Sequence, residues 1–221
     1  FEDKTKPGPY DNQYVVLRNV NKVYDNNFHA VYDFNLTIKK NEFVVFVGPS
    51  GCGKSTTLRM IAGLEDISSG ELYINGEYAN DLLSKDRDIA MVFQNYALYP
   101  NMTIYKNMAF ALQVRHFPRN LIKERVEKAA EILEITDQLD KKPKELSGGQ
   151  QQRASIARAM VKNPKLLLCD ELTGALDTKT SRAVLKFVQE VNHRYGTTIV
   201  IITHNEAIAQ MADGILKIRD G

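Results

Sequence analysis

Three short stretches of the sequence consist almost entirely of apolar residues, and they constrain the fold more than any other feature. They are residues 43–47, 166–169 and 198–202. A strand with water on one face alternates apolar and polar side chains, whereas a strand covered on both faces is apolar throughout. The three stretches therefore predict strands of a largely parallel sheet with other layers on both sides, and we expect an α/β fold.

Other patterns predict two further parts of the molecule. Residues 14–20 are rich in β-forming side chains, and residues 72–75 lead into Asn75-Gly76, a favoured hairpin turn, which predicts an antiparallel β subdomain. Apolar residues recur at helical spacing in 121–133 and 183–191. Because no convincing strand lies between 102 and 145, we expect a helical subdomain at about 96–155, inserted into the α/β core.

Composition limits the class of protein. The 221 residues make about one domain, which we place at 14–221 behind a flexible lead-in at 1–13. The 29 basic and 27 acidic residues give a net charge of +2, which is too even to indicate nucleic-acid binding. With only two cysteines, Cys52 and Cys169, a disulfide scaffold is a poor interpretation. The mean hydropathy of −0.32 argues against a membrane span, so we expect a soluble, intracellular domain.

The segment after the first apolar stretch matches a phosphate-binding motif in full. It reads Gly48-Pro49-Ser50-Gly51-Cys52-Gly53-Lys54-Ser55-Thr56. Glycines let the backbone wrap so that successive N–H groups face phosphate oxygens, and the helix that follows directs its positive end at the same anion. Lys54 is expected between the β- and γ-phosphates, Ser55 on Mg²⁺ and Thr56 on the α-phosphate. The alternative is a glycine-rich turn that merely matches, but the preceding strand and the apolar helix after it favour nucleotide binding.

The second and third apolar stretches also end in chemically useful residues. Asp170 and Glu171 close the second stretch, and His204 follows the third. In a P-loop NTPase (RecA-like) core, Asp170 would hold Mg²⁺ through a water and Glu171 would act as general base on the attacking water. Neighbours in a strand point to opposite sides, so the two carboxylates can take different roles. ATP and Mg²⁺ are the cofactors that this arrangement predicts.

A second anion-binding device lies farther along the chain. Leu146-Ser147-Gly148-Gly149-Gln150 precedes an amphipathic helix that we expect from about Gln151. Two phosphate-binding devices in one chain fit a head-to-tail dimer, in which the second loop of one chain closes over the nucleotide of the other. Over residues 14–221 the sequence resembles the nucleotide-binding domain of ATP-binding cassette (ABC) transporters.

The resemblance implies roles for further residues. Tyr24 is similar to the aromatic residue that stacks on adenine, although an ordinary tyrosine of the β layer is the alternative. Gln94 is similar to the glutamine that senses Mg²⁺ and the γ-phosphate. His204 resembles the switch histidine, and the segment around Asp177 resembles the loop that crosses the dimer interface. The family usually has proline after the catalytic glutamate, where this chain has Leu172, so the orientation of the Asp177 loop is less well determined.

The resemblance also implies that Ser147, Gly148, Gly149 and Gln150 contact the γ-phosphate held by the opposite subunit. The loop residues Ser50, Gly51, Cys52 and Gly53 would surround the phosphates of their own subunit. Together with Lys54, Ser55 and Thr56, these residues make up the predicted nucleotide site. Glu171, His204, Lys54 and Gln94 form its catalytic group, and Ser55, Gln94 and Asp170 its metal group.

Two transport groups are represented in the sequence. Residues up to about 150 resemble ATPases of carbohydrate importers, whereas the remainder resembles ATPases of macrolide-export, lipoprotein-release and peptide-resistance systems. A divergent lineage and a recombined or engineered chain both explain the change near Gln150. Importers of this kind usually carry a C-terminal regulatory domain, and a chain that starts at Phe1 and stops at Gly221 is expected to be a fragment.

The expected partners follow from the family. We expect a homodimer or heterodimer of ATPase subunits, transmembrane permease subunits, no nucleic acid, and a peripheral location on the cytoplasmic face of the membrane. A coupling helix of the permease is expected to dock on an apolar and aromatic stretch, although these residues could instead belong to the core: Tyr96, Leu98, Tyr99, Pro100 and Met102. The alternative class is a soluble ABC ATPase of translation or DNA repair, which usually has two cassettes or long coiled-coil insertions.

Overall fold

The computed structural model describes residues 12–172, 178–203 and 211–218, with side chains of 178–180 excluded. The helices and strands lie in the following order: β1 (Gln13–Val23), β2 (His29–Lys39), β3 (Phe43–Val47), α1 (Lys54–Ala62), β4 (Ser69–Ile74), β5 (Glu77–Tyr78), η1 (Ser84–Asp86), β6 (Ile89–Val92), α2 (Ile104–Val114), α3 (Arg119–Ile132), η2 (Thr136–Gln138), η3 (Pro143–Glu145), α4 (Gly148–Met160), β7 (Leu166–Asp170), α5 (Thr178–Tyr195), β8 (Thr198–Ile202) and β9 (Gly214–Lys217).

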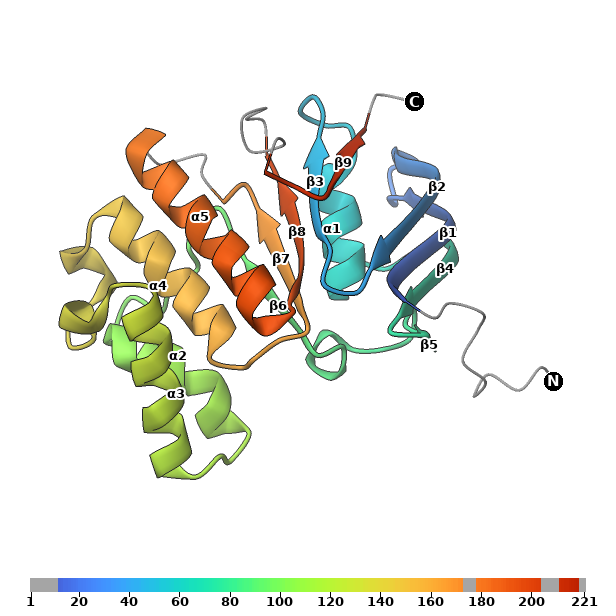
Figure 1. Cartoon of the computed structure of the whole chain (residues 1–221). Coiled ribbons are helices and arrows are strands. Elements are labelled where there is room, and N and C mark those ends of the chain that lie inside the picture. The colour runs from blue at the N-terminus through green and yellow to red at the C-terminus, as the bar shows by residue number, and fades with distance from the viewer. Residues whose placement is uncertain (1–11, 173–177, 204–210, 219–221) are drawn as a thin grey trace.

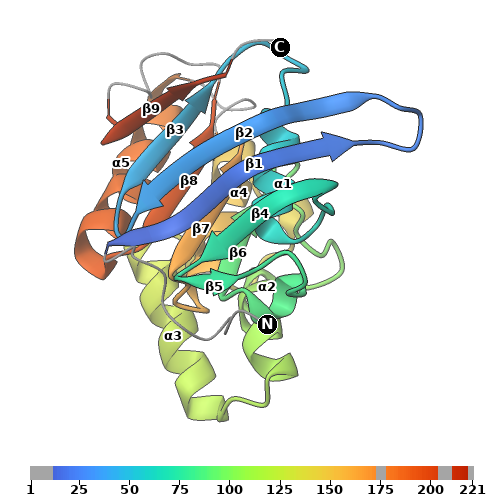
Figure 2. The ribbon, with the colours of Figure 1, turned by 90° about the vertical axis from the view of Figure 1, so that its right-hand side faces the viewer.

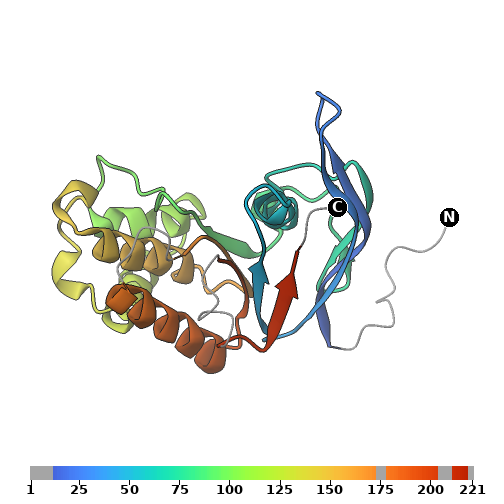
Figure 3. The same ribbon diagram turned by 90° about the horizontal axis from the view of Figure 1, so that it is seen from above.

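Two sheets organise the described chain. The first has the strand order β6-β7-β8-β3-β9, and all of its described pairs are parallel. The second has the order β2-β1-β4-β5 and is antiparallel throughout. Figure 1 shows α1 between the two sheets and α4 and α5 on the opposite face of the parallel sheet. Viewed from above, α1 is seen nearly end-on in this central position (Figure 3). The predicted α/β fold, with its antiparallel and helical parts, is confirmed.

The apolar strands are buried on both faces, as their composition predicts. In β3, Phe43 and Val45 join a core cluster with residues of α2 to α5, while Val44 and Phe46 join a second cluster with α1 and the antiparallel sheet. Leu167 and Leu168 in β7 divide between the clusters in the same way. A strand whose alternate side chains pack into two different cores has no polar face, which explains the continuous apolar runs.

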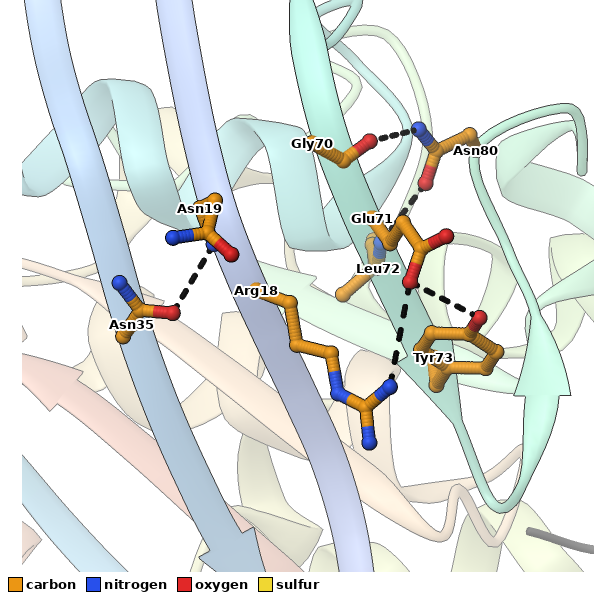
Figure 4. Close-up of polar contacts among 8 residues, drawn as sticks. All are labelled: Arg18, Asn19, Asn35, Gly70, Glu71, Leu72, Tyr73 and Asn80. Carbon is orange, nitrogen blue, oxygen red and sulfur yellow. Dashed lines mark hydrogen bonds and ion pairs between the residues drawn. The ribbon is translucent and has the colours of Figure 1, made fainter.

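The antiparallel sheet faces the viewer in Figure 2. Its register shifts after Leu17 in β1, where Asn19 has a left-handed φ of 48°. Gly70 of β4 lies opposite this bulge with φ 93°, and a Cβ there would collide with the backbone of Asn19. Polar side chains close the gap: the Asn19 N–H donates to Asn35 Oδ1 at 2.9 Å, and the guanidinium of Arg18 contacts Glu71 at 4.0 Å (Figure 4). A bulge increases strand twist, and β1 continues beyond it to Val23.

The chain between β6 and β7 contains no strand, as predicted for the helical subdomain. The helix α4 begins at Gly148, which is earlier than the predicted start near Gln151. The reason is a capping box: the Gln150 N–H donates to Ser147 Oγ at 3.3 Å, and the Ser147 N–H donates to Gln150 Oε1 at 3.0 Å. The glycines Gly148 and Gly149 therefore form the first turn of the helix rather than a loop before it.

Candidate active site

The phosphate-binding motif lies between β3 and α1. Gly51 and Gly53 have φ values of 87° and 89°, which a residue with a Cβ rarely adopts. At Gly53 a Cβ would also lie 2.5 Å from the carbonyl oxygen of Ala30 in β2. The backbone conformation therefore favours glycine at both positions, and the lack of space requires it at Gly53. The helix α1 starts immediately afterwards at Lys54. The amino end of α1 thus faces the loop, as an anion site of this kind needs.

Lys54 lies inside the loop and is only 5% exposed. Its ammonium group donates to the carbonyl oxygens of Gly48 at 2.8 Å and Pro49 at 2.5 Å, and lies 3.4 Å from the sulfur of Cys52. A buried ammonium requires such acceptors. Ser50 and Gly51 are exposed at the tip of the loop, while Thr56 is half-buried in the first turn of α1.

Ser55 connects the loop to the second predicted site. Its hydroxyl donates to Asp170 Oδ1 at 2.9 Å, and Asp170 is 8% exposed at the end of β7. A hydroxyl and a carboxylate that are adjacent in space are hard oxygen ligands, which Mg²⁺ prefers together with phosphate oxygens. The structure therefore brings Ser55 and Asp170 together as the metal prediction requires.

Gln94 and Glu171 form the second polar pair of the site. They follow β6 and β7, which are parallel neighbours, and Gln94 Nε2 donates to Glu171 Oε2 at 2.6 Å. Glu171 lies beyond the strand with φ 52°, and its N–H donates to the Ile202 carbonyl at 3.2 Å. The reasoning from strand alternation was wrong, because β7 ends at Asp170. The left-handed turn directs Glu171 toward Gln94, while Asp170 points to Ser55.

Tyr24 follows β1, and its ring contacts two side chains. Its ring stacks against Phe28 with an interplanar angle of 18° and centroids 6.5 Å apart. The ammonium group of Lys22 lies 4.9 Å from the Tyr24 ring centroid. Lys22 is itself fixed by Glu65 at 3.0 Å and by the carbonyl oxygen of Asp66 at 2.9 Å. These contacts hold the Tyr24 ring in one orientation.

Comparisons with known proteins identify the family of this chain. The family model described as ABC transporter matches residues 31–174. The chain belongs to the ABC transporter family. It is 52% identical over 202 residues to the multiple sugar-binding transport ATP-binding protein MsmK of Streptococcus mutans, with 90% of this chain and 54% of MsmK covered. It is also 52% identical over 206 residues to the oligosaccharides import ATP-binding protein MsmX of Bacillus subtilis, with 93% and 56% covered.

Solved structures give the same result for the ABC fold. A dimeric structure of MJ0796, described as a bacterial ABC transporter cassette, has a TM-score of 0.86 and 36% identity, with 94% of this chain and 95% of that chain covered. A dimeric post-hydrolysis state of MJ0796 bound to ADP and Pi has the same values. This chain thus has the fold of an ABC transporter cassette. It spans about half the length of the curated relatives it matches.

Some predicted residues of the ABC site lie outside the part of the chain that the structure describes. These are His204 and the segment around Asp177. The neighbouring Thr203 is described, and its N–H donates to the Phe46 carbonyl at 3.2 Å. Leu172, which replaces the usual proline of the family, is 2% exposed and packs in the core cluster. Among the described residues, no helix is long and apolar enough to cross a membrane.

Sequence reasoning missed the residues that support the site from outside its motifs. Lys22 precedes Tyr24 in the sequence, yet its two partners come from the connection between α1 and β4. Arg158 in α4 contacts the backbone after Gln94. The only local signal was that Arg158 interrupts an otherwise apolar stretch, which does not identify a partner.

Proposed function

We propose that this chain hydrolyses ATP as the nucleotide-binding subunit of an ABC importer for carbohydrates. The observation that carries the proposal is the pairing of Gln94 with Glu171 beside the pairing of Ser55 with Asp170. Three strand-end regions thereby converge next to the phosphate loop, at the carboxyl edge of the parallel sheet where ligands bind in open α/β folds. Family membership supplies the nucleotide, and this arrangement supplies the groups for its hydrolysis.

The described residues divide the work of hydrolysis. The backbone N–H groups of residues 50–56 bind the phosphates, and Lys54 neutralises charge that develops on the transferred group. Ser55 and Asp170 would hold Mg²⁺, which supplies Lewis-acid stabilisation of the phosphate oxygens when bound. Glu171 orients water for in-line attack and accepts its proton, while the amide of Gln94 orients the Glu171 carboxylate. His204 would complete this group as the residue that contacts the γ-phosphate.

Lys54→Ala tests the nucleotide site. Removal of the ammonium should abolish tight binding of ATP or its hydrolysis, measured by fluorescence of a labelled ATP and by phosphate release. Lys162→Ala is a suitable control, because that lysine donates to the carbonyl oxygen of Ile89, away from the loop. Near-normal turnover by Lys54→Ala would contradict the assignment.

The second part of the proposal is a head-to-tail dimer around two Mg·ATP. The amino end of α4 supports it, since Gly148 and Gly149 lie in the first turn of the helix, where the N–H groups have no acceptor within the helix. In such a dimer these groups would contact the γ-phosphate held by the other chain. Ser147→Arg should therefore impair hydrolysis while monomeric ATP binding is retained. An unchanged rate would reject the arrangement in trans.

The third part concerns the contact with permease subunits. Tyr99 is 43% exposed, and its ring lies 5.1 Å from that of Phe110 in α2. The Asn107 side chain binds both the N–H and the carbonyl of Tyr99, which fixes its backbone. We place the docking site on this surface, close to Gln94. Tyr99→Glu should lower permease-stimulated ATPase activity but not the basal rate, whereas Leu83→Glu, 62% exposed elsewhere, should change neither.

Carbohydrate is the proposed cargo because sugar-import relatives match along both parts of the chain. The alternative is a macrolide-export or lipoprotein-release system, which residues beyond 150 favoured. In a Bacillus subtilis strain without MsmX, this chain fused to the non-aligned remainder of MsmX should restore oligosaccharide uptake. MsmX itself, cut and rejoined at the same position, is the control. Restoration by the control but not by the fusion would contradict the cargo.

A further inference from the structure

The loop that follows Gln94 has an unfavourable backbone. Tyr96 and Ala97 are consecutive and have φ values of 60° and 49°, in the left-handed region. For residues with a Cβ this conformation costs about 1–2 kcal/mol each. Local hydrogen bonds from Tyr96 to Phe93 and from Ala97 to Asn95 close the turn. Contacts from elsewhere in the molecule must offset the remaining cost, because such conformations persist only when the surroundings impose them.

Two side chains of α4 make these contacts. Ser155, which is 1% exposed, donates its hydroxyl to the Tyr96 carbonyl at 2.8 Å. Arg158 donates from one guanidinium nitrogen to the Ala97 carbonyl at 2.6 Å and from another to the Tyr96 carbonyl at 3.4 Å. Ser155 and Arg158 are three positions apart and thus lie on the same face of α4. Both carbonyls of the left-handed turn are therefore bound by one helix.

Arg158 is well placed to hold the left-handed turn against α4. Its planar guanidinium can bind two acceptors at once, which a lysine ammonium does less well. It also lies 5.9 Å from the ring centroid of Tyr99, so that it contacts the loop at three residues, Tyr96, Ala97 and Tyr99. Burial lowers the pKa of Arg158, because partial removal from water disfavours the charged guanidinium. A half-buried cation needs acceptors such as these carbonyl oxygens in place of the water it has lost.

The loop and the helix each carry part of the nucleotide site. Gln94 lies just before the turn and donates to Glu171, and Ser147 caps the amino end of α4. We propose that Arg158 is a positioning residue: by holding the turn at Tyr96 and Ala97 against α4, it keeps Gln94 in place for hydrolysis. It would thereby join the part of the site that senses the γ-phosphate of its own subunit to the helix that meets the other subunit. The inference rests on the proposed function.

The test compares Arg158→Met with Arg125→Met. Arg125 in α3 also donates to a carbonyl, that of Val161 at 3.5 Å, and lies 5.1 Å from the ring of Phe117. Neither contact involves the segment that follows Gln94. Arg158→Met should lower kcat about 10- to 100-fold with KM for ATP within about twofold, since only the geometry of the reacting groups changes. Arg125→Met should leave kcat unchanged even if it lowers the melting temperature.

A double-mutant cycle with Gln94→Ala separates positioning from simple stabilisation. If Arg158 acts through Gln94, Arg158→Met should cost less than about twofold further in kcat once Gln94 is removed. Arg158→Lys should give an intermediate kcat, and Ser155→Ala a smaller loss than Arg158→Met. Should Arg158→Met fail to fold, the cycle is run with Arg158→Lys instead. Additive losses in the cycle, or an unchanged kcat in the single variant, would overturn the inference. Wild-type protein without ATP binding or hydrolysis would instead refute the proposed function.

Discussion

The hydroxyl of Ser55 lies 2.9 Å from the carboxylate of Asp170, although 115 residues separate them in the sequence. Because Asp170→Asn keeps an oxygen at this position but removes its charge, we expect the fold to survive and the metal affinity to fall. The concentration of Mg²⁺ for half-maximal ATPase activity should rise at least about tenfold, while metal-free ATP binding stays within about twofold. A titration with Mg²⁺ measures both, and an unchanged midpoint would contradict the metal site.

The carboxylate of Glu171 is the proposed base, and its replacement should separate binding from hydrolysis. In Glu171→Gln the amide oxygen still accepts from Gln94, yet no group can take the proton of the attacking water. We expect kcat to fall at least about 100-fold, with ATP-bound dimer accumulating in light scattering. Glu134→Gln is the control, because Glu134 is 80% exposed at its side chain and pairs with Arg153. Turnover by Glu171→Gln near the wild-type rate would assign the base elsewhere.

The two cysteines should differ in their reaction with alkylating reagents. Cys52 lies half-buried in the phosphate loop, 3.4 Å from the ammonium of Lys54, and its modification should block ATP binding. Cys169 is fully buried, and burial raises the pKa of its thiol, so that little reactive thiolate forms. We expect inactivation by one modification per chain, prevented by ATP. Equal inactivation of Cys52→Ala would rule out this site of reaction.

Tyr14 should make the protein less stable in alkali. It is 7% exposed in β1, and burial, with a smaller effect from Asp88, raises its pKa from 10.0 to about 12. Above pH 10 the unfolded chain loses this proton while the folded chain keeps it, so the free energy of unfolding falls as pH rises toward 12. The loss is at most about 2–3 kcal/mol. In Tyr14→Phe this contribution is absent.

Urea unfolding of both proteins at pH 9 and pH 11 checks the Tyr14 prediction. All other titrating groups are shared by the two proteins, so the difference between them isolates Tyr14. The wild type should lose more stability than Tyr14→Phe between the two pH values. Identical losses would show that the hydroxyl of Tyr14 titrates in the folded state as it does in the unfolded chain.

Much of the fold follows from local patterns, but not all of it. The strands β3, β7 and β8 were predictable because two packed layers demand apolar residues on both faces. The strand β2 was not, because most of its residues are exposed or half-buried and the polar Asp33 and Asn35 lie within it. Its partner β1 imposes the extended conformation, and β-propensity yields to such tertiary pairing.

Some features of the site could likewise be predicted from the sequence, and others could not. The positions of the phosphate loop, Asp170 and Glu171 were predictable because each follows an apolar stretch of the sequence. Contacts between distant segments were not: Lys22 reaches a carbonyl 44 residues away, and Arg158 one 61 residues away. The start of α4 was placed too late because Ser147 and Gln150 cap the helix at the glycines. The Ser-x-x-Gln spacing of this capping box was the signal in the sequence that would have placed the start of the helix at Gly148.

The parallel pair β6 and β7 has a consequence for how the family can diversify. A single helix, α4, is enough to connect two parallel neighbours, so α2 and α3 form an excursion within that connection. Such an excursion can be lengthened, shortened or exchanged without disturbing the register of β6 against β7, on which the contact of Gln94 with Glu171 depends. The surface proposed to meet the permease includes α2. Under the proposed function, evolution can therefore change the membrane partner while the contact between Gln94 and Glu171 stays the same.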